Sequence, residues 1–152
     1  MKFTKPHFIA SVSSEAQEQK KLLISKYGDF DENDSDIFIV LGGDGFMLQA
    51  IKDYMDKKVP FFGINYGSIG FLMNAVSTDD LLTRLEKTQS VQLSPLIMTA
   101  YDQDDKFHTA KAINEVSLLR QTHQAAKLKV FIDDQVRLDE LICDGILLAT
   151  PS

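Results

Sequence analysis

The chain has 152 residues, of which 44% are hydrophobic and 25% charged, as in an ordinary soluble globular protein. That length allows one domain with its own core, or one domain and part of another. The 16 basic and 22 acidic residues give a net charge of −6, which argues against general electrostatic binding to nucleic acid or to an anionic membrane.

The lengths of the apolar runs and the number and spacing of the cysteine and histidine residues limit the cellular location and the metal binding that we expect. No apolar run approaches the ~20 residues that a membrane-spanning helix needs, and residues 1–7 lack the apolar core of a signal peptide, so we expect a cytoplasmic protein without a membrane partner. Cys143 is the only cysteine, which excludes an internal disulfide, and its apolar neighbours predict a buried, unreactive thiol. His7, His108 and His123 have no metal-ligand spacing to one another or to Cys143, so we predict no protein-held metal site.

The first ninety residues alternate between strand and helix patterns. Residues 7–12 are typical of a strand, and Ser14-Glu15-Ala16-Gln17 has the spacing of a capping box for the helix that follows. We expect this helix to reach about Tyr27, with Gly28 just after its end. The acidic stretch 29–36 is predicted to be a solvated loop, the alternative being an acidic surface for a partner.

The most informative stretch is an apolar run, residues 37–41, that ends at Gly42-Gly43-Asp44-Gly45. Five consecutive apolar residues favour a strand that is covered on both faces, as in a parallel sheet. The following residues 46–55 permit a helix, and apolar side chains spaced to share one of its faces are Met47, Ala50, Ile51 and Tyr54. The glycine-rich turn therefore lies at the sheet edge where α/β proteins bind ligands and where unpaired helix amides attract anions.

A second glycine-bearing loop follows the next predicted strand. Residues 59–65 resemble a strand, and residues 66–70 form a loop at its carboxyl end with Gly67 and Gly70. If the strands are parallel, both glycine loops lie on one edge of the sheet. Residues 77–80 can cap a further helix through about Lys87, with three leucines facing inward, namely Leu81, Leu82 and Leu85.

The pattern of predicted elements changes past about Ser90, from alternating strands and helices to strands and turns only. We place a domain boundary there. Strand patterns without helices follow in four runs, 91–101, 107–120, 127–132 and 136–149, with a predicted hairpin turn at Asp133-Asp134-Gln135. We predict an α/β domain over residues 1–90, three-layered with a mostly parallel sheet. The start of an all-β, sandwich-like domain is predicted over residues 91–152.

The turn at residues 42–45 matches neither of two common nucleotide-binding templates. It lacks the third glycine of the dinucleotide fingerprint and the Gly-Lys-Ser/Thr ending of a Walker A loop. Its glycines let phosphates approach the backbone closely, while the carboxylate of Asp44 can point at the ligand. The alternative is that Asp44 caps the helix after it, a position where aspartate is favoured.

Two further stretches carry polar side chains among apolar ones. Strand alternation over residues 110–118 places Asn114 on an apolar face, and Glu115 on the other face unless a bulge or a strand end lets both reach one ligand. A buried amide needs either a backbone partner or a ligand such as a purine edge. Asp144 interrupts the apolar run 141–149 and needs a structural partner or a bound hydroxyl, of which we favour the ligand.

Four sequence blocks resemble those of the NAD kinase family and occur in the same order along the chain. The blocks are Leu41-Gly42-Gly43-Asp44-Gly45, Gly63-Ile64-Asn65 with Gly67 and Gly70-Phe71-Leu72, Ala112-Ile113-Asn114-Glu115-Val116, and Asp144-Gly145 leading to Ala149-Thr150-Pro151-Ser152. A glycine–aspartate turn alone also occurs in lipid kinases and phosphofructokinases. Members of the resembled family transfer a phosphoryl group from ATP or polyphosphate to the adenosine-ribose 2′-hydroxyl of NAD and so make NADP, and their second domain is rich in β-strands.

The resemblance implies roles for the glycine–aspartate turn. Asp44 would be the catalytic residue that accepts the proton of the ribose 2′-hydroxyl, and it would contact NAD together with Gly45. The phosphate donor would be bound at Gly42, Gly43 and Gly45. The positive charge needed for phosphoryl transfer would come from Mg²⁺ or another divalent cation carried on ATP or polyphosphate, and not from a metal held by the protein.

The same resemblance implies that the rest of the NAD site lies beyond residue 90. Asn114 and Glu115 would contact the adenine and ribose, Asp144 would make a further NAD contact, and Ser152 would lie on the adenine side. The partners implied are NAD and a nucleoside triphosphate or polyphosphate, and a homo-oligomer is expected for the full-length form.

This sequence departs from the family pattern at three places. Phe46 stands where the family turn usually continues with threonine, and Ile142 stands where a basic residue is frequent. The chain ends at Ser152, where family members continue through the β-domain, so we expect the 152-residue chain to be inactive by itself. The alternatives to an NAD kinase are a lipid or sugar kinase with a similar turn, or a non-catalytic dinucleotide-binding fragment.

Overall fold

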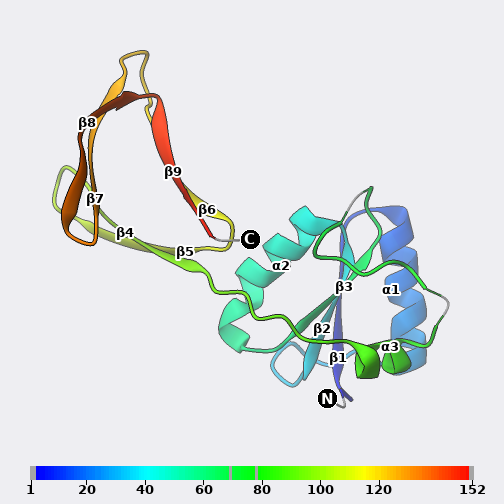
Figure 1. The fold of residues 1–152 in the computed structure, drawn as a ribbon. Helices are drawn as coiled ribbons and strands as arrows, with labels where there is room; N and C mark the ends of the chain where they lie inside the picture. Colours follow the sequence, from blue (N-terminus) through cyan, green and yellow to red (C-terminus); the bar gives the residue numbers. More distant parts are fainter. Residues whose placement is uncertain (1–2, 69, 78, 151–152) are drawn as a thin grey trace. The chain divides into compact units, whose positions relative to one another are not determined.

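The computed structural model describes residues 3–68, 70–77 and 79–150 and divides the chain into two compact units, Met1–Val91 and Gln92–Ser152. The first unit has a three-stranded parallel sheet with helices, and the second has antiparallel strand pairs (Figure 1). This confirms the predicted order of an α/β fold followed by antiparallel β-structure. Within the described ranges, no helix is long and apolar enough to cross a membrane.

The sheet of the first unit is built around its central strand. Its strands are β1 (Pro6–Ala10), β2 (Ile37–Gly42) and β3 (Phe61–Asn65), in the order β1-β2-β3. All residues of β2 are buried, as expected for a strand with neighbours on both sides and helices on both faces. The parallel register brings the ends of β2 and β3 together, because Gly42 pairs with Asn65.

Helices cover both faces of this sheet (Figure 1). They are α1 (Ser14–Tyr27), α2 (Asp44–Tyr54), the short 3-10 helix η1 (Met55–Lys57) and α3 (Leu81–Lys87). Ile39 and Leu41 of β2 belong to a core cluster with residues of α1 and α3, whereas Val40 packs with Met47 and Ala50 of α2. Alternate residues of β2 thus face different helical layers, and the predicted three-layer arrangement is confirmed.

The start of α1 differs from the predicted capping box by one residue. Ser13 is the N-cap, and its hydroxyl accepts a hydrogen bond from the N–H of Ala16 at 3.3 Å. Ser14 is already helical, and the side chain of Gln17 donates to backbone carbonyls before the helix. The predicted end is confirmed: the helix ends at Tyr27, and Gly28 has a φ of 77°, which glycine adopts without strain.

Two apolar residues of the first unit are more exposed than predicted. The first strand ends at Ala10, so Val12 lies beyond it and is fully exposed. In α3 the side chains of Leu81 and Leu85 are buried, but Leu82 is 41% exposed. Residues four apart share a helix face and adjacent residues do not, so the inward prediction was wrong for Leu82.

The second unit consists of three two-stranded antiparallel pairs among its described residues. The strands are β4 (Leu96–Tyr101) with β5 (Phe107–Ala112), β6 (Glu115–Leu119) with β9 (Gly145–Ala149), and β7 (Ala126–Ile132) with β8 (Gln135–Cys143). Asp133 and Asp134 both have positive φ and join β7 to β8 in a two-residue turn, which confirms the predicted hairpin.

The second unit buries little apolar surface. Every buried hydrophobic side chain in the described part of the chain belongs to the first unit, whereas Ile97, Leu119 and Leu148 are largely exposed. Cys143 is a free, half-buried thiol, so the prediction of a buried cysteine was wrong. A two-stranded ribbon leaves both faces of its residues open unless another layer covers them.

Candidate functional site

The glycine–aspartate turn joins β2 directly to α2. Gly43 is the N-cap of α2 in an extended conformation, and its carbonyl accepts the N–H of Met47 at 3.0 Å. No side chain of the described residues caps this helix, and Asp44 is its first helical residue. The alternative in which Asp44 caps α2 is therefore wrong, and its carboxylate serves elsewhere.

The carboxylate of Asp44 is held by the backbone of the second glycine loop. The N–H of Phe71 donates to Oδ2 at 2.7 Å, and the N–H of Leu72 donates to Oδ1 at 3.0 Å. Asp44 is half-buried, so one side of the carboxylate still reaches solvent. Each carboxylate oxygen can accept more than one hydrogen bond, and both keep capacity for a ligand hydroxyl.

The two glycine loops touch at a second place. The N–H of Tyr66 donates to the carbonyl of Gly42 at 2.8 Å, and the N–H of Gly67 donates to Oδ1 of Asn65 at 2.8 Å. A Cβ atom on Gly67 would lie only 3.1 Å from the Cα of Gly43. The prediction that both loops lie on the same edge of a parallel sheet is confirmed, and a side chain at position 67 would crowd their contact.

One residue of the turn, Gly45, has open space where a side chain would begin. A Cβ atom on Gly45 would meet no atom of the described residues within 4 Å, whereas one on Gly70 would lie 3.2 Å from Oδ1 of Asp44. The loop is thus packed against Asp44, whereas no described residue fills the space beside the Cβ position of Gly45.

Phe46 occupies the position where the family pattern usually has threonine. Its ring packs on Gly42, because a Cβ atom on Gly42 would lie 2.8 Å from the Cδ1 atom of Phe46. The ring also packs, partly buried, against the cluster of Val40, Met47 and Ala50. Phe46 therefore supports the turn by packing and offers no hydroxyl to a phosphate.

Asn114 and Glu115 lie where β5 gives way to β6. Asn114 is in a bend and is exposed, and its carbonyl accepts hydrogen bonds from the N–H and hydroxyl of Thr150 at 2.8 and 3.1 Å. The predicted apolar face for Asn114 was wrong, because β5 pairs with β4 and β6 pairs with β9, so the alternation does not run through residue 114. Glu115 begins β6 opposite Ala149.

Asp144 has a structural partner that the sequence pattern did not reveal. Its carboxylate pairs with Nε of Arg120, and its carbonyl accepts the N–H of Arg120 at 2.9 Å. The carboxylate is 77% exposed, so the cost of burial that was expected for it does not arise. Leu119 pairs with Gly145 in the ladder, and this register places Arg120 beside Asp144.

The residues predicted to bind NAD in the second unit do not form one cluster. Asn114 and Glu115 lie at one end of the β6–β9 ribbon, and Asp144 lies at the other, ~13 Å away at the usual rise per strand residue. Ser152 lies outside the described residues. In the first unit, by contrast, Gly42, Gly43, Asp44 and Gly45 form one continuous turn.

Comparison with known proteins places this turn in a family. Residues 1–90 match the model of the ATP-NAD kinase N-terminal domain, which is more than half of the chain. The chain belongs to the NAD kinase family.

Individual relatives agree with this assignment. The chain is 47% identical over 149 residues to an NAD kinase of Caulobacter vibrioides, covering 98% of the chain and 57% of that relative. It is 48% identical over 151 residues to an NAD kinase of Rhizobium meliloti, covering 99% of the chain and 59% of that relative. The chain thus spans less than three fifths of the length of these NAD kinases.

A solved structure supports the fold of this NAD kinase family member. The crystal structure of an NAD kinase from Archaeoglobus fulgidus in complex with ATP superposes with a TM-score of 0.64 and 21% sequence identity. The match covers 95% of the chain and 60% of the solved one. At this identity the likeness establishes the arrangement of elements and no residue roles.

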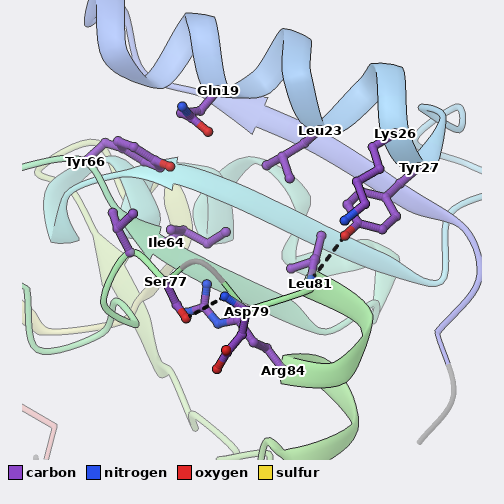
Figure 2. Close-up of a pocket in the computed structure, with 11 residues that line it drawn as sticks. Gln19, Leu23, Lys26, Tyr27, Ile64, Tyr66, Ser77, Asp79, Leu81 and Arg84 are labelled. Atoms are coloured by element: carbon purple, nitrogen blue, oxygen red, sulfur yellow. Dashed lines mark hydrogen bonds between the residues drawn. The ribbon is translucent and has the colours of Figure 1, made fainter.

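A separate cavity of roughly 120 Å³ lies among α1, β3 and α3, on the sheet face opposite to α2. Figure 2 shows Gln19 and Lys26 of α1, Tyr66 beyond β3 and Arg84 of α3 around it. Burial raises the pKa of the Tyr66 hydroxyl. The lining includes the acidic side chain of Asp79 as well as the basic side chains of Lys26 and Arg84. The charge of the cavity therefore selects no class of ligand.

An ion-pair network beside this cavity joins α1 to α3. Asp80, the N-cap of α3, accepts hydrogen bonds from Nζ of Lys26 at 2.8 Å and from the hydroxyl of Tyr27 at 2.6 Å. The Lys26 hydrogen bond is the main cause that lowers the pKa of Asp80 to about 2, and the Asp80 hydrogen bond raises the pKa of Lys26. The network joins α1 to α3 and does not include Asp44.

Proposed function

We propose that the chain forms part of an NAD kinase, which transfers a phosphoryl group from ATP or polyphosphate to the adenosine-ribose 2′-hydroxyl of NAD. The observation that carries this proposal is the carboxylate of Asp44, fixed by the amides of Phe71 and Leu72 in a turn whose Gly45 has open space at its Cβ position. A carboxylate held in this way can aim an alcohol at a phosphorus atom. Phosphoryl transfer depends mainly on such positioning and on charge stabilisation.

In the proposed reaction Asp44 accepts a hydrogen bond from the ribose 2′-hydroxyl and takes its proton. The 2′-oxygen forms a bond to the terminal phosphorus of the donor, and the bond from that phosphorus to the bridging oxygen breaks. The electron pair of the broken bond leaves with the shortened donor. Gly42, Gly43 and Gly45 border the space for the donor phosphates, where the backbone can come close.

The positive charge for this step comes, in our proposal, with the donor. Among the described residues, no group of three or more His, Cys, Asp or Glu side chains is placed to hold a metal ion. Mg²⁺ or another divalent cation would neutralise charge that develops on the phosphate oxygens. Asp44 and the backbone of the turn then have only to orient the two substrates.

We assign the NAD contacts of the second unit as part of the same proposal. Asn114 and Glu115 contact the adenine and ribose, Asp144 makes a further NAD contact and Ser152 lies on the adenine side. The proposed domains are residues 1–90 and 91–152, and the full-length form is proposed to be a cytoplasmic homo-oligomer that binds neither nucleic acid nor membrane. The sequence blocks that resemble the family support these assignments.

The 152-residue chain by itself is proposed to be inactive, as a dinucleotide-binding fragment would be. This second proposal rests on one observation, namely that no described residue of the second unit is a buried hydrophobic. Two-stranded ribbons without a core are marginally stable in water. A β-unit in this state would hold its NAD contacts poorly.

The test compares two proteins for NADP formation from NAD, ATP or polyphosphate, and Mg²⁺. One is the 152-residue chain, and the other is a chimera in which it is joined to the part of the Caulobacter vibrioides relative that the match leaves uncovered. We expect the chimera to form NADP only when a divalent cation is present, and the chain alone to form none. A chimera that binds NAD but forms no NADP would overturn the kinase proposal, and NADP formation by the chain alone would overturn the proposal of inactivity.

A further inference from the structure

The two amides that hold Asp44 belong to residues whose own side chains are not buried. Phe71 is 94% exposed and Leu72 is 37% exposed. Their backbone N–H groups nevertheless lie within hydrogen-bond distance of Asp44. The loop must therefore be held by other contacts, and the residues that follow in the chain, Met73 and Asn74, make them.

Asn74 attaches the loop to the outer edge of β3. Its N–H donates to the carbonyl of Gly63 at 2.9 Å, and its carbonyl accepts the N–H of Asn65 at 2.9 Å. These two bonds form a parallel bridge opposite Ile64. The side-chain amide of Asn74 also donates to the carbonyl of Gly63 at 3.0 Å. The loop is thus bonded to the strand through both the backbone and the side chain of one residue.

Met73 attaches the loop to α2, the helix that begins with Asp44. A Cβ atom on Gly63 would lie 2.4 Å from Sδ of Met73 and 2.8 Å from Cε of Met47. The two methionines thus meet above a glycine of β3, and Met73 packs on the cluster that holds Val40 and Met47. Its side chain links the loop, the sheet and α2 in one contact.

We infer that Met73 and Asn74 are positioning residues for Asp44. They pin residues 70–74 to β3 and α2, and this sets the amides of Phe71 and Leu72 against the carboxylate. The inference rests on the proposed function in so far as Asp44 is the reacting base. Neither side chain has to touch a substrate, because both act through the loop. A displacement of about 1 Å at such a group can lower a rate about 100-fold.

The test measures amide hydrogen exchange by NMR in the 152-residue chain. We expect Met73→Ala and Asn74→Ala to speed exchange of the Phe71 and Leu72 amides at least about tenfold, since local opening of a loop exposes its amides. Met73→Leu keeps most of the volume and should restore slow exchange. The amides of β2 report whether the unit as a whole has loosened.

A matched control removes apolar contacts from the same unit without touching the loop. Leu85 is 4% exposed and packs in the cluster of α1 and α3, on the other face of the sheet. We expect that in Leu85→Ala the exchange rates of the Phe71 and Leu72 amides, taken as a ratio to those of the β2 amides, stay the same as in the parent chain. Equal acceleration in this control, or no acceleration in Asn74→Ala and Met73→Ala, would overturn the inference.

A kinetic measurement on the chimera separates positioning from folding. We expect Asn74→Ala and Met73→Ala to lower kcat about 10- to 100-fold, with KM for NAD changed less than about threefold, because the loss falls on the orientation of Asp44. Unchanged kcat despite faster exchange would contradict the positioning role. If the unsubstituted chimera forms no NADP, the proposed function fails, while the exchange experiment still tests whether Met73 and Asn74 hold the loop.

Discussion

The carboxylate of Asp44 accepts a hydrogen bond of 2.7 Å from the backbone N–H of Phe71, which lies 27 residues further along the chain. With the Leu72 amide on the other oxygen, this bond makes the first turn of α2 and the loop after β3 a single structure. A side chain held by two backbone donors cannot rotate freely. The orientation of the proposed base is therefore set before any substrate arrives.

Gly67→Ala should separate the two glycine loops. The added Cβ would lie 3.1 Å from Cα of Gly43, so one backbone must move by a few tenths of an ångström. We expect a loss of about 1–3 kcal/mol in the free energy of unfolding, as is usual for overpacking, and a lower kcat in the chimera. Urea denaturation and NADP formation measure these effects, and wild-type values for both would contradict the close contact of the loops.

Gly45→Ala should have the opposite effect on stability. Gly45 lies in the first turn of α2 and has nothing within 4 Å of an added Cβ, so alanine meets no clash and favours the helix by about 0.5–1 kcal/mol. The methyl group would project into the open space that we assign to the ligand. We expect a slightly higher unfolding midpoint together with a raised KM for NAD or the donor, and an unchanged KM would argue against a ligand at this position.

Phe46→Thr would restore the residue type that is usual in the family. Because the ring of Phe46 packs on Gly42 and on the Val40 cluster, we expect its removal to destabilise the unit by about 1–3 kcal/mol, less than for a fully buried phenylalanine. We predict that kcat falls and that KM for the donor does not decrease. A donor KM that drops in Phe46→Thr would show that a hydroxyl can serve here and that the ring is dispensable.

The Asp80 network should make stability depend on acid pH. The pKa of Asp80 is lowered from 3.8 to about 2 in the folded chain, so its contribution to stability is present above pH ~4 and is lost as the pH falls toward 2. The pKa of Lys26 is raised, so the contribution of Lys26 to the free energy of unfolding is fully present below pH 10.5 and is lost only at higher pH. Urea midpoints between pH 5 and 2 should fall less steeply in Asp80→Asn than in the parent chain.

The control for this pH experiment is Asp79→Asn, which changes a neighbouring carboxylate that does not cap α3. Its midpoints should follow those of the parent chain over the same pH range. Parallel curves for the parent chain and Asp80→Asn would mean that Asp80 gains nothing from Lys26 and Tyr27.

Local patterns predicted the part of the site that is continuous in sequence. The fully apolar run of β2, the glycine turn and the apolar face of α2 each have a periodic or compositional signature, and their order places Asp44 at the sheet edge. The amides of Phe71 and Leu72 have no such signature, because every residue except proline carries a backbone donor. Their contact with Asp44 emerges only from the tertiary structure.

Contacts between distant segments account for the errors in the second unit. Asn114 was placed on an apolar face by assuming one strand through residues 110–118, but the change of pairing partner there was invisible in the alternation. The pairing of Arg120 with Asp144 has no signature in the sequence, because their proximity depends on the register of β6 with β9. Strand pairing, unlike strand pattern, is not a local property of the chain.

The most direct test of the account compares two aspartates of α2 in the chimera. Asp44→Ala removes the proposed base, whereas Asp53→Ala removes an exposed carboxylate at the other end of the helix, which accepts a hydrogen bond from the side-chain amide of Gln49. We predict that Asp44→Ala lowers the rate of NADP formation by about 10²–10⁴, the usual range for a general base, while Asp53→Ala stays within about twofold. Equal rates of NADP formation in both variants would contradict the role of Asp44.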